Sequence, residues 1–294
     1  MSSRTEAGRS SWPAPAKLNL FLHVTGRRPD GYHEIQTLFQ LLDWGDEIFI
    51  RTTADGTIGR EPADYPVAEA DDLVVRAAKS LQQATACSQG ARIGVSKRIP
   101  LGSGLGGGSS DAATVLLALN HLWGCGLDRS ALATLGVRLG ADIPLFVHGR
   151  TAMATGIGDR LEPVELGIRH YVLVCPAVSI ETRAIFADPD LRRDSQPISL
   201  AEALVGRGRN DCEAVVRKHY PAMVSAFETL RRWGQPVMTG TGSGIFLQMD
   251  SADRAMSAAR EIKSLYNVRA VSGVDQSSLH LILDANGQQS DLSV

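Results

Sequence analysis

A glycine-rich stretch between Pro100 and Ser110 most restricts what this chain can fold into. Five of the seven residues from Gly102 to Gly108 are glycine. Glycines at this density cost backbone entropy, so packing alone rarely explains them. They allow backbone N–H groups to approach a ligand closely, beside the positive end of a helix. Because a strand pattern (91–97) precedes the loop and an apolar helical pattern (112–122) follows it, the stretch predicts a phosphate-binding loop.

Three common glycine-loop chemistries fit this stretch poorly. A P-loop needs a lysine directly after its last glycine, and Ser109 stands at that position. The dinucleotide-binding pattern G-x-G-x-x-G matches formally at Gly102, Gly104 and Gly107. The acidic residue at the required distance, Asp128, is however predicted to cap a helix and not to end a strand. A protein kinase would carry HRD and DFG motifs downstream, and the sequence contains neither.

The composition of the chain argues against several other classes of protein. The chain has 294 residues, a formal net charge of −2 and 5% aromatic residues, which gives no electrostatic or stacking case for nucleic acid or an anionic membrane. No apolar run reaches the roughly 18 residues of a membrane span, and residues 1–11 lack the apolar core of a secretory signal. The four cysteines form no CxxC pair and the seven histidines no HExxH motif. We therefore expect a cytoplasmic protein with reduced, structural cysteines and no metal site built from its side chains.

Hydrophobic patterning divides the first half into alternating strands and helices. Asp71 or Asp72 is expected to cap one helix and Asp128 another, because short acidic side chains accept hydrogen bonds from exposed N–H groups. Residues 141–144 (ADIP) are expected to form a tight, non-helical corner. The predicted strands are 17–24, 34–43, 46–53 and 91–97, the helices run from about 73 to 86, 112 to 122 and 130 to 139, and the loops are 26–33 and 55–70.

The second half shows the same alternation, so the fold class is mixed α and β in two layers. We place a domain boundary near residue 160, in a loop that contains Gly156 and Gly158, and expect a polar tail from 285 to 294. The predicted strands are 151–154, 170–175, 236–239, 245–249, 268–271 and 279–283, and the predicted helices are 182–187, 200–205, 211–219, 223–233 and 252–265.

The motifs together resemble one superfamily of small-molecule kinases. The pattern P-x-G-x-G-L-G-x-G-S-S at 100–110 is similar to the phosphate loop of the GHMP kinases, which include galactokinases, homoserine kinases and mevalonate kinases. Within that superfamily the chain, from about Ala14 to Leu283, resembles the 4-diphosphocytidyl-2-C-methyl-D-erythritol kinases of the non-mevalonate isoprenoid pathway. The other matching stretches are 13–39, 139–149, 176–186, 209–213 and 238–244.

The resemblance implies an α+β two-domain protein. Residues 1–160 would form an ATP-binding domain like domain 2 of ribosomal protein S5. Residues 161–294 would form a ferredoxin-like α/β sandwich that binds substrate. The cofactors implied are ATP and Mg²⁺, and the partner is a small-molecule substrate, cytidine diphosphate-linked methylerythritol, phosphorylated on its 2-hydroxyl. We expect no nucleic-acid or membrane partner, and a monomer or weak homodimer.

The same resemblance assigns the donor loop and a catalytic pair. Asp142 would be the base that takes the proton of the acceptor hydroxyl, and Lys17, at the head of the first strand, would orient that hydroxyl. Lys97 would either approach the adenine or form a salt-bridged strand end. The residues expected to bind ATP are Lys97, Pro100, Leu101, Gly102, Ser103, Gly104, Leu105, Gly106, Gly107, Gly108, Ser109 and Ser110.

Substrate binding is assigned by resemblance to two further stretches. Tyr32 would stack on the cytosine, His33 would hydrogen-bond its edge, and Phe186 would close the opposite face. Asn19 lies on the same strand face as Lys17 because side chains alternate along a strand, and Thr182 would face the phosphate path.

Three features leave alternatives open. The acceptor could be another small alcohol, such as homoserine or mevalonate, although Tyr32 and His33 favour a pyrimidine. A non-catalytic nucleotide-binding module is also conceivable, and the presence of both Lys17 and Asp142 argues against it. Gly244 stands where the kinase superfamily more often has a small side chain or a cysteine, which puts a side-chain role at this position in doubt. Asn210 and Asp211 are expected to cap a helix.

Overall fold

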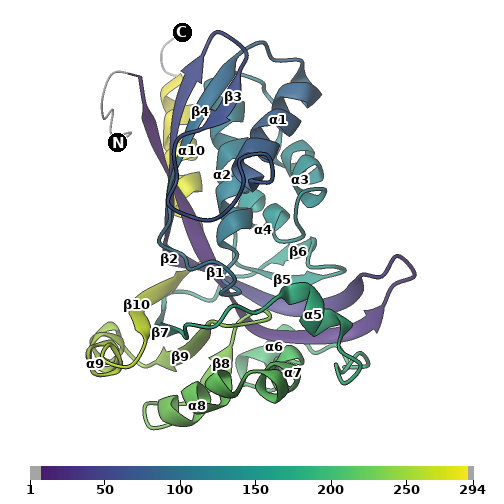
Figure 1. The fold of residues 1–294 in the computed structure, drawn as a ribbon, viewed down its shortest axis with the longest axis vertical. Helices are drawn as coiled ribbons and strands as arrows, with labels where there is room; N and C mark the ends of the chain where they lie inside the picture. The colour runs from purple at the N-terminus through teal and green to yellow at the C-terminus, as the bar shows by residue number, and fades with distance from the viewer. Residues whose placement is uncertain (1–7, 291–294) are drawn as a thin grey trace.

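The computed structural model describes residues 8–290, and two long antiparallel strands form its frame (Figure 1). β1 (Ser10–Arg27) and β2 (His33–Thr53) pair along their length, from Ser10 opposite Ile50 to Arg27 opposite His33. The prediction of two separate strands at 34–43 and 46–53 is wrong. Gly45 allows the strand to continue, because any Cβ there would lie 2.0 Å from the carbonyl oxygen of Ala14.

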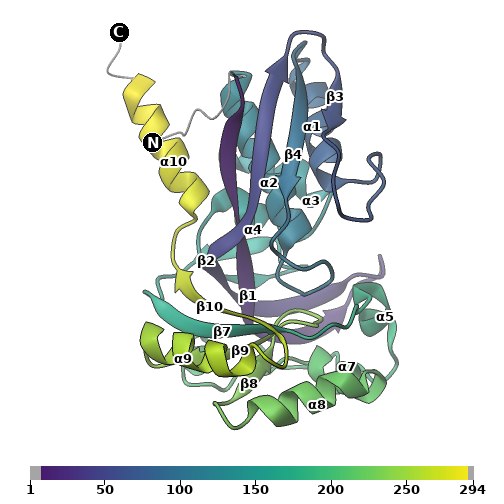
Figure 2. The same ribbon diagram turned by 60° about the vertical axis from the view of Figure 1, so that its left-hand side comes forward.

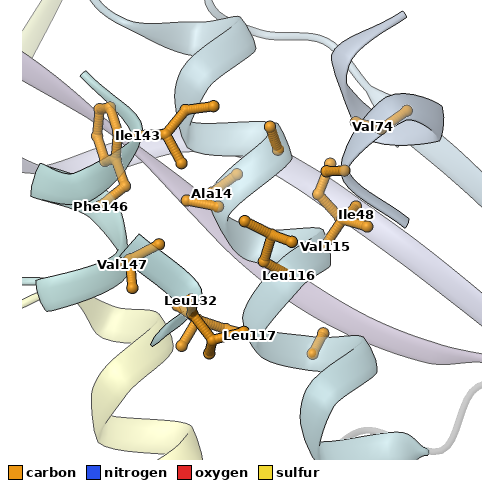
Figure 3. Packing of buried hydrophobic residues seen from close by; sticks show 14 of the residues in the cluster. Ala14, Ile48, Val74, Val115, Leu116, Leu117, Leu132, Ile143, Phe146 and Val147 are labelled. Carbon is orange, nitrogen blue, oxygen red and sulfur yellow. The ribbon is translucent and has the colours of Figure 1, made fainter. Parts of the chain in front are cut away.

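The first half packs helices on one face of this frame. Strands and helices share one hydrophobic core, in which Ala14 and Ile48 meet Val115 and Leu116 (Figure 3). Asp72 and Asp128 cap α1 and α3 as predicted, accepting from Val74 N and Ala131 N. The elements are β3 (Ile58–Arg60), α1 (Leu73–Thr85), β4 (Gly90–Ser96), α2 (Gly107–Leu122), α3 (Arg129–Val137), α4 (Ile143–His148), β5 (Ala152–Thr155) and β6 (Arg160–Pro163).

The second half continues the same sheet and has its own core. Its elements are β7 (Arg169–Cys175), α5 (Thr182–Ala187), α6 (Leu200–Leu204), α7 (Cys212–His219), α8 (Pro221–Leu230), β8 (Pro236–Met238), β9 (Ile245–Met249), α9 (Ala252–Ile262) and β10 (Asn267–Val274). The strand order is β3-β4-β2-β10-β7-β9-β8, so the sheet runs through both halves. In Figure 2, α8 lies at the bottom of this half and α9 lies beside β7 and β9.

Two segments connect the halves. The far end of β1 contributes Leu22 and Val24 to the core of the second half. At the other end of the chain, α10 (Ser278–Ser290) returns to the first half, where Leu279 joins its core (Figure 1). The predicted strand at 279–283 is therefore wrong, and the helix also covers much of the predicted tail, of which residues 291–294 lie outside the described part. Leu279 and His280 are buried while Leu281 is exposed, so the start of this helix buries one side and exposes the other.

Three further differences concern short elements. Residues 58–60 form β3 inside a segment predicted to be irregular, and β6 was not predicted. α2 begins at Gly107, five residues earlier than the apolar run that predicted it. The predicted non-helical corner at 141–144 is also wrong, since α4 begins at Ile143. Pro144 occupies an early helical position, where a missing N–H costs nothing.

The mixed α and β class is confirmed. Among residues 8–290, no helix has the length and apolar character needed to span a bilayer. The four cysteines, Cys87, Cys125, Cys175 and Cys212, are free.

Candidate active site

A cleft of about 420 Å³ lies where the glycine loop, the middle of β1, the N-terminus of α4 and α5 meet. This size suits a small-molecule ligand. Of the predicted site residues, Tyr32, His33 and Ser110 do not line it. Those that do are Lys17, Asn19, Lys97, Pro100, Leu101, Gly102, Ser103, Gly104, Leu105, Gly106, Gly107, Gly108, Ser109, Asp142, Thr182 and Phe186.

The glycine loop depends on left-handed backbone at three positions. Gly102, Gly104 and Gly106 have φ values of 66°, 71° and 75°. Gly106 is the N-cap of α2, and the first helical hydrogen bond runs from Ser110 N to the carbonyl oxygen of Gly106, at 2.8 Å. The preceding N–H groups have no partner within the helix, so the cleft contains a helix N-terminus suited to anionic oxygens.

A second glycine-containing segment, residues 239–244, packs against the backbone of the glycine loop. Gly244 N donates to the carbonyl oxygen of Ser103 at 2.9 Å. A Cβ at Gly104 would lie 2.4 Å from the carbonyl oxygen of Thr239, and one at Gly244 would lie 2.6 Å from that of Ser103. The two segments therefore touch through backbone, and at Gly244 no side chain fits without a shift of the loop.

Asn210 holds this second segment in place. Its Nδ2 donates to the carbonyl oxygens of Met238 and Gly240, at 2.8 and 2.7 Å, and its Oδ1 accepts from Cys212 N. Asn210 precedes the N-cap of α7, Asp211, so it satisfies the first helical N–H from one position before the predicted cap. Asp211 makes no side-chain capping bond, and its Oδ2 accepts from Val24 N on β1 instead.

Lys17 and Asp142 meet in the cleft. Lys17 Nζ lies 3.4 Å from Asp142 Oδ2, and it donates to Asn19 Oδ1 at 2.5 Å and to the carbonyl oxygen of Gly104 at 2.9 Å. The lysine side chain is 4% exposed and the aspartate side chain 31%. Asp142 is the N-cap of α4 but makes no capping bond with its side chain, so its carboxylate is free to face the cleft.

Asn19 lies on the same face as Lys17, as predicted. Its Nδ2 donates to Thr37 Oγ1 at 2.9 Å, and its backbone N–H donates to Thr239 Oγ1 at 2.8 Å. Thr182 Oγ1 lies 2.9 Å from Thr241 Oγ1. Sequence reasoning missed Thr239 and Thr241 as parts of the site. The alternation of threonine with glycine in the 238–244 stretch was the available signal.

Of the three residues predicted to bind cytosine, Phe186 lines the cleft, and His33 packs against it. The rings of His33 and Phe186 have centroids 5.2 Å apart and planes inclined by 32°. Tyr32 is 59% exposed. Its backbone N–H donates to Asp30 Oδ1, which orders the turn between β1 and β2. The structure therefore brings Phe186 and His33 together, whereas the Tyr32 side chain is exposed on the turn.

Lys97 forms the salt-bridged strand end that was one of its two expected roles. It pairs with Asp46 and with Asp111 Oδ2, the latter at 2.8 Å. Asp46 Oδ1 also accepts backbone N–H groups, whereas Asp111 Oδ1 is buried with no described partner. Burial raises the pKa of Asp111 to about 8, against the opposing charge of Lys97. Burial lowers the pKa of Lys97, but the two carboxylates outweigh it and the net shift is upward.

Sequence comparison identifies relatives across almost the whole chain. Residues 72–150 match the family model for the GHMP kinases N-terminal domain. The 4-diphosphocytidyl-2-C-methyl-D-erythritol kinase of Halorhodospira halophila is 50% identical over 277 residues, which cover 93% of this chain and 96% of that protein.

Solved structures extend the comparison to the fold. A crystal structure of a 4-(cytidine 5'-diphospho)-2C-methyl-D-erythritol kinase superposes with a TM-score of 0.78 at 34% identity, covering 90% of this chain and 98% of that one. A mevalonate kinase crystal structure reaches a TM-score of 0.65 at 13% identity, with 91% and 99% coverage. The second likeness concerns the fold alone.

Proposed function

This chain belongs to the 4-diphosphocytidyl-2-C-methyl-D-erythritol kinase family of GHMP kinases, and we propose that it transfers the γ-phosphoryl group of ATP to the 2-hydroxyl of that substrate. The reaction is a step of non-mevalonate isoprenoid precursor biosynthesis. One observation carries the proposal: the ion pair of Lys17 and Asp142 lies in the same cleft as the glycine loop.

The donor phosphates are proposed to bind at the start of α2. Phosphoryl transfer depends mainly on positioning and on neutralising charge. The N–H groups of Gly107, Gly108 and Ser109 precede the first helical hydrogen bond, so they can donate to phosphate oxygens. Lys97 is engaged by two carboxylates, and its ammonium group borders the ATP site as part of a nearly neutral cluster.

The acceptor hydroxyl is proposed to bind between Asp142 and Lys17. Asp142 Oδ takes the proton as the hydroxyl oxygen attacks the γ-phosphorus, and ADP leaves with the electrons of the broken P–O bond. Lys17 donates hydrogen bonds and holds the hydroxyl and the carboxylate in one orientation. General-base catalysis of this kind contributes on the order of 10²- to 10⁴-fold to a rate.

The residues present fit a Mg²⁺ ion that arrives with ATP. Among residues 8–290, no group of three His, Cys, Asp or Glu side chains forms a metal cage. Mg²⁺ usually keeps several waters and needs only one or two protein oxygens beside the phosphates. Ser109, which lines the cleft at the start of α2, would supply the candidate protein oxygen. When bound, the ion supplies positive charge to the β- and γ-phosphates.

Substrate recognition is proposed at the α5 end of the cleft. Tyr32 and Phe186 stack on the cytosine, and His33 hydrogen-bonds its edge. Asn19 and Thr182 contact the part of the substrate nearer the phosphates. The packing of His33 on Phe186 supports this assignment, because it brings the proposed stacking ring and the proposed edge-binding ring together.

The proposed division into domains follows the two large cores. We assign residues 1–160 to an ATP-binding unit like domain 2 of ribosomal protein S5, and 161–294 to a ferredoxin-like sandwich. The separate hydrophobic clusters of the two halves support it. One strand and one helix cross this division: β1 contributes to the core of the second unit, and α10 packs on the core of the first.

Phosphorus NMR of a reaction containing ATP, Mg²⁺ and the cytidine diphosphate-linked methylerythritol tests the proposal. We expect a new phosphomonoester signal together with ADP. Homoserine and mevalonate serve as control acceptors, because a sister kinase would phosphorylate one of them instead. A folded protein that binds ATP but produces no phosphomonoester with any of the three contradicts the assignment.

A further inference from the structure

Arg193 holds the imidazole of His33 from outside the cleft. Its Nε donates to His33 Nε2 at 3.0 Å. The same guanidinium donates through Nη1 to the carbonyl oxygen of Leu191, and through Nη2 to those of Phe186 and Asp188, at 2.9, 3.0 and 2.7 Å. Each nitrogen of Arg193 is thus engaged. The residue ties His33 to the end of α5, which carries Phe186.

This contact decides which nitrogen of His33 carries the proton. A guanidinium has N–H donors only and no acceptor. His33 Nε2 must therefore be the unprotonated nitrogen that accepts, and the neutral ring carries its proton on Nδ1. Burial, followed by the charges of Arg193 and Arg27, lowers the pKa of His33, which favours the neutral ring. Among the described residues, Nδ1 has no hydrogen-bond partner, which leaves its N–H for a ligand.

We propose that Arg193 is a positioning residue that fixes His33 in the Nδ1–H form and thereby makes the site prefer cytosine over uracil. The inference rests on the proposed function, because it assumes that a pyrimidine edge meets His33. Cytosine presents an unprotonated N3 that accepts from an N–H donor. Uracil presents N3–H at the same place, where two donors would oppose each other. A site whose N–H donor meets a second donor instead of an acceptor disfavours that ligand, because neither group is then paired.

Arg193 contacts Phe186 as well as His33, so its loss can weaken binding in two ways. The ratio of the affinities for a cytosine and a uracil nucleotide separates them. Loss of Arg193 would also loosen the Phe186 carbonyl, and weaker stacking would affect cytosine and uracil alike. Only a change in the tautomer of His33 alters the preference between the two bases. A structural role alone would therefore lower both affinities and leave their ratio unchanged.

The test combines nitrogen NMR of His33 with the dissociation constants of CDP and UDP, measured by titration calorimetry. The His33 signals are assigned by comparison with His33→Gln. In the unmodified protein we expect the Nδ1–H form and tighter binding of CDP than of UDP. In Arg193→Met we expect a mixture of both tautomers and a CDP-over-UDP preference reduced about tenfold, the size of one lost hydrogen bond. Arg192→Met, which removes an exposed arginine paired with Asp194, should change neither quantity.

A second variant guards against a folding defect in Arg193→Met. Arg193→Lys keeps a cationic donor near His33 Nε2, so we expect the Nδ1–H form and a CDP preference within about threefold of the unmodified protein. An Nε2–H ring in the unmodified protein, or an unchanged CDP-to-UDP ratio in folded Arg193→Met, would overturn the inference. Because these readouts need no turnover, a failure of phosphoryl transfer would contradict the proposed function separately.

Discussion

Lys17 Nζ donates a hydrogen bond to the carbonyl oxygen of Gly104 at 2.9 Å, so the first strand and the glycine loop are joined inside the cleft. The backbone reinforces this link, because Lys17 N donates to the carbonyl oxygen of Leu105. The same ammonium group reaches Asp142. A single buried side chain therefore sets the distance between the proposed phosphate-binding loop and the proposed base.

Replacing Asp142 by asparagine should abolish most turnover and leave ATP binding intact. The amide keeps the shape of the side chain but cannot take a proton, so we expect kcat to fall by about 10²- to 10⁴-fold. Steady-state kinetics and the Kd of a non-hydrolysable ATP analogue measure the two effects. Asp250→Asn, at an exposed site near α9, is the matched control. A rate near that of the control would remove Asp142 as the base.

Replacing Lys17 by arginine should not rescue the function lost in Lys17→Met. The Lys17 side chain is almost fully buried and its ammonium group donates to Asn19 and Gly104, and the larger planar guanidinium does not reproduce this geometry. We expect kcat/KM to fall at least about 100-fold in both variants, through lost orientation of the acceptor hydroxyl. Lys79→Met, on the exposed face of α1, is the control. Substantial activity in Lys17→Arg would show that charge alone suffices.

Gly104→Ala should disturb the loop far more than Gly124→Ala. Both glycines have positive φ values, 71° and 67°, so both substitutions carry backbone strain of about 1 kcal/mol. The added Cβ at Gly124 meets nothing within 4 Å, whereas at Gly104 it meets the carbonyl oxygen of Thr239. We expect Gly104→Ala to raise the KM for ATP at least about tenfold and to lower the free energy of unfolding further, by urea titration. Equal effects of the two variants would argue against the close contact.

The buried carboxyl of Asp111 predicts a pH-dependent gain in stability for Asp111→Asn. Its pKa in the folded protein, about 8, lies above the ordinary value of 3.8, so ionisation opposes folding. The stability contributed by the protonated form is complete below about pH 4 and is lost as the pH rises to about 8. The variant avoids this loss. We expect its free energy of unfolding, relative to the unmodified protein, to increase by more than about 1 kcal/mol from pH 4.5 to 8.5.

Urea unfolding at several pH values measures this difference, with Asp250→Asn as the exposed control. A difference that stays constant with pH, or that shrinks as the pH rises, would mean that Asp111 is ionised in the folded protein at neutral pH. In that case the Lys97 cluster would contain two charged carboxylates.

Sequence patterns predicted the elements whose signals are local. α5 and β9 have the predicted bounds, because short apolar runs and turn residues mark their ends. The caps at Asp72 and Asp128 also followed from residues next to the helix they begin. By contrast, residues 279–283 suit either a strand or a helix. Their helical form depends on packing against the first core, where His280 Nε2 contacts the carbonyl oxygen of Val147 at 2.8 Å.

The sequence by itself determined the glycine loop, the alternation of strands and helices, and the family whose motifs the chain carries. Only the tertiary structure decided that Lys17 reaches both Gly104 and Asp142, and that Arg193 holds His33. These partners are separated by 87 to 160 positions in the chain. Such contacts depend on the register of β1 and β2 and on how α4 and α5 pack. Neither the register nor the packing is encoded by a local pattern of residues.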